Sequence, residues 1–328
     1  MSIFYIPIIL TYKMNIYNSK IDFFFIKFPF IFPIIYFLVL HLNPEYEIYI
    51  IAFTILLLAE PHFGATWPIF FDKINKEYFS NEKIIFYFGT AIITVTSLIG
   101  FFLFKNLFLL IFFAFNIYHV TRQSVGVAKL YNTNIKEFFF QKKCLYGFNL
   151  LFFIIGYLRF YNNVIDPSHK STLIIFIIST ILIFIMIEFI KYKSFLNSLT
   201  TFTGIMIFFP ISFVDNPIHA ILMGVTMHYS QYIFITAKVN FGRKNLLYIL
   251  KNLEFFKFLK SNFFITIFFY TLLMGIFSLS PKIVNIDMLK NLIVIPIIGQ
   301  MLHFYLDGFI WKFSELHNRE ATLKYLKM

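Results

Sequence analysis

Residues 300–312 read Gln-Met-Leu-His-Phe-Tyr-Leu-Asp-Gly-Phe-Ile-Trp-Lys, an apolar segment that carries a histidine and, one helical turn later, a carboxylate. If this segment crosses a membrane as a helix, His303 and Asp307 are both buried at depth. Ionisable groups are costly to bury in hydrocarbon and usually mark a functional site. The segment therefore predicts a membrane helix that forms one wall of a polar site.

The whole chain is unusually apolar. It has 328 residues, of which 59% are hydrophobic, 22% aromatic and only 13% charged, and its mean hydropathy is +0.77. This composition excludes a soluble globular domain of this size and is typical of a polytopic membrane protein. The single cysteine, Cys144, excludes an intrachain disulfide and any cysteine-ligated zinc or iron–sulfur site. Histidine and carboxylate are the metal ligands that remain.

Apolar runs of about 20 residues predict an all-α bundle of about ten transmembrane helices. The predicted spans are residues 23–42, 46–71, 84–104, 106–129, 145–158, 172–190, 199–214, 217–237, 263–279 and 290–312. No internal repeat or low-complexity linker divides the chain, so residues 1–328 are predicted to form a single transmembrane domain.

The positions of lysine and arginine give an independent prediction of orientation. With the N-terminus and the ends of the even-numbered helices on one side, that side collects 22 of the 28 cations and the other side five. The positive-inside rule then predicts that both termini are cytoplasmic. It also explains the net charge of +12 without a nucleic-acid partner. The chain is expected to be a multi-pass protein of the lipid bilayer, in the inner or plasma membrane if the source is bacterial.

The loop at residues 239–262 mixes basic residues such as Arg243, Lys251 and Lys257 with leucine and phenylalanine. This pattern predicts an amphipathic segment on the cytoplasmic membrane surface. A solvated basic loop is the alternative.

Four of the eight histidines share one predicted depth: His62, His119, His228 and His303. Each precedes a lysine by 9 to 11 residues, which places it about 14–17 Å from the cytoplasmic side, near the middle of a hydrocarbon core about 30 Å thick. They lie on the second, fourth, eighth and tenth predicted helices, which run in the same direction. A lone midplane histidine can simply hydrogen-bond a neighbouring helix. Four at matched depth favour a shared metal or haem site, because neutral imidazole is the commonest metal ligand.

Polar residues accompany these histidines in the sequence. A metal-bound histidine normally gives its other ring N–H to a carboxylate, amide or carbonyl. The candidate catalytic or ligand-orienting residues are Glu60, Gln123, Gln231 and Asp307. Such residues can equally satisfy helix contacts. Arg122 lies within the fourth predicted span and is expected to be the only buried cation, with Glu60, Asp307 and a substrate headgroup as alternative partners.

Residues 60–65, Glu-Pro-His-Phe-Gly-Ala, resemble a Pro-His-Gly-Ala stretch of the Brp/Blh-type β-carotene 15,15′-dioxygenases. His119, within residues 118–126, follows at a distance similar to that between the first two histidines of that family. The resemblance implies a polytopic membrane fold, a histidine-bound iron and cleavage of β-carotene to retinal. The chain departs from the family pattern where Phe63 interrupts the motif. His228 and His303 also come from separate helices instead of forming a pair four residues apart.

These observations favour a membrane-embedded oxidoreductase, similar to a dioxygenase, that binds non-haem iron (Fe²⁺) through the four midplane histidines. Its substrate would be lipophilic, a carotenoid if the resemblance extends that far. A b-type haem protein with histidine pairs as axial ligands is one alternative. A transporter that uses intramembrane histidines and carboxylates is another. Phosphate-binding glycine loops, His-Glu-x-x-His and Gly-x-Ser-x-Gly are absent from the sequence.

Overall fold

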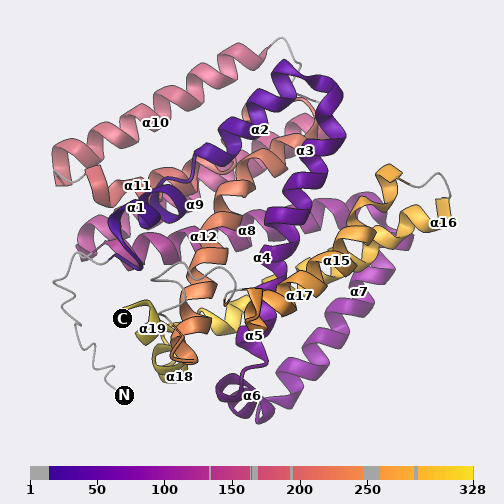
Figure 1. Cartoon of the computed structure of the whole chain (residues 1–328). Helices are drawn as coiled ribbons and strands as arrows, with labels where there is room; N and C mark the ends of the chain where they lie inside the picture. Colours follow the sequence, from indigo (N-terminus) through magenta and orange to yellow (C-terminus); the bar gives the residue numbers. More distant parts are fainter. Residues whose placement is uncertain are drawn as a thin grey trace.

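The computed structural model describes residues 15–132, 134–162, 164, 169–192, 195–246, 257, 259–283 and 287–327. Within these ranges the regular structure is entirely helical, with no strand (Figure 1). The predicted all-α class is therefore confirmed.

The helices follow one another with short connections, and η marks 3-10 or π-helical segments. The first part of the chain contains α1 (Ser19–Ile21), η1 (Asp22–Lys27), α2 (Ile31–Leu42), η2 (Pro44–Tyr46), α3 (Glu47–Thr54), η3 (Ile55–Ala59), α4 (Glu60–Gly64), α5 (Thr66–Phe70), α6 (Lys73–Ser80), η4 (Ile84–Phe88), α7 (Gly89–Leu103) and α8 (Lys105–Tyr131). The second part contains α9 (Ile135–Gly156), η5 (Tyr157–Tyr161), α10 (Lys170–Tyr192), α11 (Phe195–Met206), η7 (Phe209–Ser212), α12 (Pro217–Arg243), α15 (Asn262–Ile283), α16 (Asp287–Lys290), η8 (Asn291–Ile293), α17 (Val294–Ile310), α18 (Leu316–Asn318), η9 (Arg319–Leu323) and α19 (Lys324–Leu326).

Among the described residues, six helical segments are long and apolar enough to cross a membrane. They are Pro44–Phe70, Ile84–Leu103, Ile135–Tyr161, Ser171–Glu188, Asn262–Lys282 and Asn291–Ile310. The pair Ser19–Lys27 and Ile31–Leu42, bent by 51°, is a seventh candidate if it forms one span. The chain thus has the helices of a multi-pass membrane protein, although fewer candidate spans than the ten predicted.

The other three predicted spans correspond to α8, α11 and α12. Helices α8 and α12 each have 27 residues, about 40 Å at 1.5 Å per residue, so length is not what sets them apart. They carry many polar side chains, and those side chains are buried, as at Asn116, Ser124 and Gln231. Helix α11 has only 12 residues and is followed by the 3-10 segment η7.

Helix α12 is the core of the bundle. Most of its residues are buried, and in Figure 1 it runs through the middle, with α10 along one edge and α7 along the opposite edge. At Gly224 its backbone meets the Ile207 carbonyl so closely that a Cβ would lie 1.6 Å from that oxygen. Only glycine allows this approach.

The outer helices present apolar surface instead. Helices α7, α10 and α15 expose large aliphatic and aromatic side chains, for example Leu103, Ile175 and Phe269. Apolar surface of this extent is expected where a protein meets lipid.

The segment at 239–262, predicted to be amphipathic, is described in the structure only at residues 239–246, 257 and 259–262. Helix α12 continues to Arg243, and its last residues, including Val239 and Phe241, are buried. Residues 247–256 lie outside the described residues. The Arg243 guanidinium donates hydrogen bonds to the carbonyls of Ala321 (2.7 Å) and Ile69 (3.1 Å). These bonds hold the C-terminal helices against the ends of α12 and α5.

Candidate metal centre

The four midplane histidines meet in the middle of the bundle. His62 lies on α4, His119 on α8, His228 on α12 and His303 on α17, and their exposed fractions are 1%, 6%, 2% and 0%. The His62 ring centroid is 4.6 Å from that of His303 and 4.7 Å from that of His228. The His119 centroid is 4.9 Å from that of His303 and 5.7 Å from that of His228. We call these four side chains the histidine layer.

The ring nitrogens of the histidine layer are poorly satisfied. Five buried nitrogens have no hydrogen-bond partner, namely both nitrogens of His62 and the Nε2 atoms of His119, His228 and His303. One ligand atom from each of His62, His119 and His228 lies within 4.8 Å of the others. An unpartnered buried polar group costs about 1–3 kcal/mol. A cluster of bare imidazole nitrogens is therefore the donor set that a transition metal would use.

A local irregularity precedes His62. Pro61 has no N–H, so it cannot complete the helical hydrogen bond to the Leu57 carbonyl. The chain responds with the π-helical turn η3, in which the N–H of Glu60 bonds to the Ile55 carbonyl five residues back. Helix α4 then begins at Glu60 and carries His62 in its first turn. Single π turns inside helices are frequent at functional sites.

A second group of polar side chains lies one helical turn beyond the histidines, because each histidine is followed four residues later by a polar residue on the same helix face. Thr66 follows His62, Gln123 follows His119, Tyr232 follows His228 and Asp307 follows His303. Thr66, Tyr232 and Asp307 are buried. We call these four side chains the polar layer.

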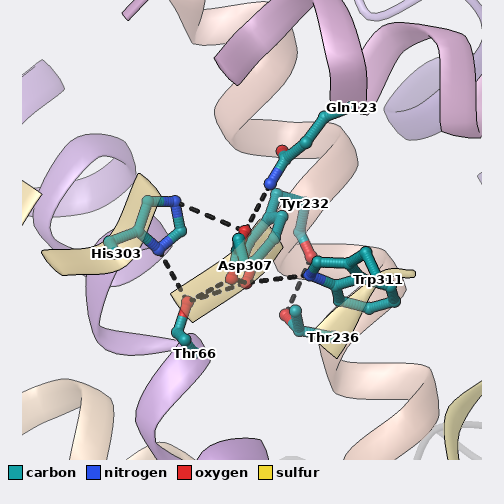
Figure 2. Close-up of polar contacts among 7 residues, drawn as sticks. All are labelled: Thr66, Gln123, Tyr232, Thr236, His303, Asp307 and Trp311. Carbon is teal, nitrogen blue, oxygen red and sulfur yellow. Dashed lines mark hydrogen bonds and ion pairs between the residues drawn. The ribbon is translucent and has the colours of Figure 1, made fainter. Parts of the chain in front are cut away.

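Asp307 is the centre of the polar layer (Figure 2). Its Oδ1 accepts hydrogen bonds from the Tyr232 hydroxyl at 2.7 Å and the Thr66 hydroxyl at 3.2 Å, and its Oδ2 accepts one from the Gln123 amide. The Trp311 indole N–H donates to the Tyr232 hydroxyl at 3.4 Å. Side chains from α5, α8, α12 and α17 are thus tied to a single carboxylate.

The two layers are joined through His303. Its Nδ1 lies 2.7 Å from the Thr66 hydroxyl. In the tautomer in which Nδ1–H donates to the Thr66 hydroxyl, the lone pair of Nε2 is free to bind a metal, and the Thr66 hydroxyl donates its own hydrogen bond to Asp307 Oδ1. Asp307 Oδ2 lies 3.6 Å from His303 Nε2. A second candidate ligand group therefore consists of His119, His303 and Asp307.

The predicted catalytic residues divide into two pairs. Gln123 and Asp307 lie in the polar layer. Glu60 faces α15, where its Oε1 accepts a hydrogen bond from the Ser278 hydroxyl at 2.5 Å while Oε2 has no partner. The Gln231 amide donates to the Ile26 carbonyl of η1 at 2.6 Å. The hydrogen bonds of Glu60 and Gln231 therefore lead away from the histidine layer.

Sequence reasoning missed Thr66, Tyr232 and Trp311. The signal was present, since Thr66 and Tyr232 each lie four residues after a midplane histidine and Trp311 lies four residues after Asp307. These spacings put them on the helix faces that carry the site.

A cavity of about 570 Å³ adjoins the two layers. It lies between α8, α12 and α17, and its walls are mostly apolar and aromatic, including Phe115, Met301 and Phe304. His119, His228 and Asp307 line it as well. Its volume is in the range of pockets that hold one small molecule.

Comparison of the chain with protein-family models, with curated proteins and with solved structures finds no match. The chemistry of the site must therefore be argued from its own geometry.

Proposed function

We propose that this chain is a membrane-embedded oxidoreductase that binds one non-haem iron ion through His62, His119, His228 and His303 and acts with O₂ on a lipophilic substrate. One observation carries the proposal: four buried imidazoles from four separate helices face one another with five ring nitrogens unpartnered.

The donor set fits a metal ion. Imidazole suits iron, zinc, copper and nickel, and a neighbouring carboxylate adds preference for a harder ion such as Fe²⁺. The four histidines would hold the ion, with Asp307 close enough to His303 to join them or to orient that ring. A bound iron would supply the redox chemistry toward O₂ that side chains cannot provide.

The chain itself would contribute orientation and exclusion of water. Thr66 fixes the His303 ring through its hydrogen bond to Nδ1, and the Asp307 network fixes Thr66. The adjoining cavity brings an apolar molecule against His119 and His228. Supporting shells of this kind usually set metal affinity as strongly as the ligands do.

The compactness of the histidine layer favours a mononuclear centre over haem. A b-type haem needs two axial histidines on opposite faces of a flat macrocycle. Here His62 and His119, whose centroids are 6.5 Å apart, both lie within 5 Å of the His303 centroid. That third ring takes up the space between them that a porphyrin would need.

The proposed topology has ten spans, with α12 crossing the membrane as a buried inner helix and α8 crossing it with its polar residues turned inward. Both termini would lie on the side that collects 22 of the 28 cations, in the cytoplasm of an inner or plasma membrane. The resemblance of residues 60–65 to the β-carotene dioxygenases supports iron as the metal and a carotenoid as one lipophilic substrate to test.

The experiment is metal analysis and absorption spectroscopy of the full chain purified in detergent under anaerobic conditions. We expect about one iron per chain and no Soret band. The variants His62→Ala and His303→Ala should lose the iron, whereas the control His219→Gln should retain it. A haem spectrum, or iron content equal in all four proteins, would overturn the proposal.

A further inference from the structure

Arg122 is an exposed cation on α8 that lies beside the cavity and within the fourth predicted span. It stands seven residues before Lys129 on α8, about 10 Å from the cytoplasmic end of that helix. Among the described residues no carboxylate forms an ion pair with it, although Asp307 lines the same cavity.

The direction of the Arg122 side chain is informative. Arginines near helix ends usually extend toward the water so that the charge stays hydrated. The Arg122 guanidinium instead lies over the Tyr118 ring, with Cζ 5.7 Å from its centroid. Tyr118 is one turn closer to the N-terminus of α8, and the guanidinium also approaches α17, where a Cβ added to Gly308 would lie 3.5 Å from Arg122 Nη1. The charge is therefore held at the edge of the cavity between α8 and α17.

Arg122 belongs to the wall of the 570 Å³ cavity. The cavity residues of α8 recur every three or four positions, from Phe115 and Tyr118 through His119 and Arg122 to Gly126. They therefore form one helix face. Phe115 and Tyr118 are 48% and 52% exposed, which opens this side of the cavity laterally, toward the acyl chains of a bilayer.

We infer that the cavity binds a long-chain monocarboxylate, with the carboxylate on the Arg122 guanidinium and the apolar chain along the aromatic wall. The reason is charge complementarity: the exposed Arg122 guanidinium borders the cavity and forms no ion pair among the described residues, and its planar fork matches a carboxylate. An apolar enclosure sized for one small molecule favours a single chain over a two-chain phospholipid.

This inference names the ligand class of the cavity. It rests on the proposed function only in calling that ligand the substrate of an oxygenase. Arg122 lies one turn after His119 on the same helix face, so a carboxylate held there would keep the first part of the chain beside the histidine layer. Binding itself requires no metal.

The test uses the full chain in nanodiscs of neutral phosphatidylcholine. Binding of radiolabelled oleate is measured in wild type, Arg122→Gln, Arg122→Lys and the control Lys129→Gln, whose lysine lies on the same helix outside the cavity. Oleyl alcohol supplies the same chain without charge, and phosphatidylglycerol supplies an anionic headgroup on two chains. Iron content is measured on every sample.

We expect oleate to bind wild type and Lys129→Gln equally, and Arg122→Gln roughly tenfold to a hundredfold more weakly. Arg122→Lys should fall between them, and oleyl alcohol should bind wild type and Arg122→Gln alike. Absence of oleate binding, equal oleate binding to Arg122→Gln, or displacement by phosphatidylglycerol as effective as by oleate would each overturn the inference. Iron-free protein with Arg122-dependent oleate binding would overturn the proposed function alone.

Discussion

The histidine layer and the polar layer lie one helical turn apart on the same or consecutive helices, yet they differ in how far their polar atoms are hydrogen-bonded. In the polar layer both oxygens of Asp307 accept hydrogen bonds, from Thr66, Tyr232 and Gln123. In the histidine layer five buried nitrogens have no hydrogen-bond partner. The chain thus satisfies the hydrogen bonds of one layer and leaves those of the other unmade. This difference supports the proposal that the polar layer is a scaffold and the histidine layer a binding site.

His219 shows how the chain satisfies a buried histidine that is structural. It lies in the first turn of α12 and is only 3% exposed. Its Nδ1 lies 2.8 Å from the Tyr36 hydroxyl and its Nε2 lies 3.1 Å from a Glu47 oxygen. Both nitrogens are paired, in contrast to those of His62.

Removal of metal should have the largest effect on stability. A ligand present at 100 to 1,000 times its dissociation constant stabilises the folded state by about 3–4 kcal/mol, so chelation should lower the melting temperature in detergent and added Fe²⁺ should restore it. His62→Ala should abolish this dependence. Because the His62 ring makes no hydrogen bond, any loss of stability of the metal-free protein should come only from the ring packing that the substitution removes.

His219→Gln is the matched control for this measurement. It should lower the melting temperature with and without metal, because Tyr36 and Glu47 lose their partner, while the increment from Fe²⁺ stays at the wild-type value. A melting temperature of wild type that does not respond to Fe²⁺ would contradict the assignment of the histidine layer as a binding site.

Asp307→Asn should damage both layers. The new amide presents donors to donors such as the Gln123 amide, and a buried charged hydrogen bond is worth about 1.5–3 kcal/mol. We expect a loss of stability of that size together with about tenfold to hundredfold weaker metal binding. Thermal unfolding and metal titration check the two effects separately, and unchanged metal affinity would show that the polar layer does not support the histidine layer.

Thr66→Val should have a smaller effect of the same kind. The substitution keeps the shape but removes the hydrogen bond to His303 Nδ1, so we expect a loss of about 1–3 kcal/mol and roughly tenfold weaker metal binding. Thr200→Val is the control, since the Thr200 hydroxyl is buried without a partner. Replacement of Thr200 should leave stability unchanged or increase it. Equal losses of stability in Thr66→Val and Thr200→Val would contradict the distinction between hydrogen-bonded and unpaired buried hydroxyls.

The smallest expected effect is a pH response outside both layers. His317, in the C-terminal α18, donates a hydrogen bond from Nε2 to Asn75 Oδ1 and stacks on Tyr78. Burial, with Arg243 nearby, lowers the pKa of His317 below its ordinary value. The unfolded chain therefore takes up the proton more readily, and stability is full above about pH 6.5 and falls below it.

The loss on going from pH 7 to pH 5 should stay under about 1 kcal/mol, because His317 is partly exposed. His317→Phe keeps the stacking on Tyr78 and should remove this part of the pH dependence in thermal unfolding. An undiminished pH dependence in His317→Phe would assign it to other groups.

The sequence predicted part of the composition of the site. Counting residues to the lysine that follows each histidine predicted one common level for His62, His119, His228 and His303, and the structure brings these four side chains together. Depth alone cannot predict this convergence, because it also depends on which helices are neighbours and how each is rotated about its axis. The polar layer was predictable from the spacing of four residues, which keeps side chains on one helix face.

Glu60 and Gln231 show that the level of a residue along a helix does not determine the direction in which its side chain points around the helix axis. A helix turns by about 100° per residue, so Glu60, two residues before His62, faces α15 instead of the site. Gln231, three residues after His228, reaches the backbone of η1. Hydropathy has a related weakness: α8 and α12, whose polar residues face inward, are not among the helical segments that meet the composition expected of a membrane span.

X-ray absorption at the iron edge of the full chain, purified anaerobically in detergent, tests the central claim most directly. The account predicts about one iron per chain with scattering from three to four imidazole rings, reduced by one ring or lost altogether in His62→Ala and unchanged in His219→Gln. Iron scattering without imidazole, or identical spectra for wild type and His62→Ala, would contradict the assignment of the histidine layer as the metal centre.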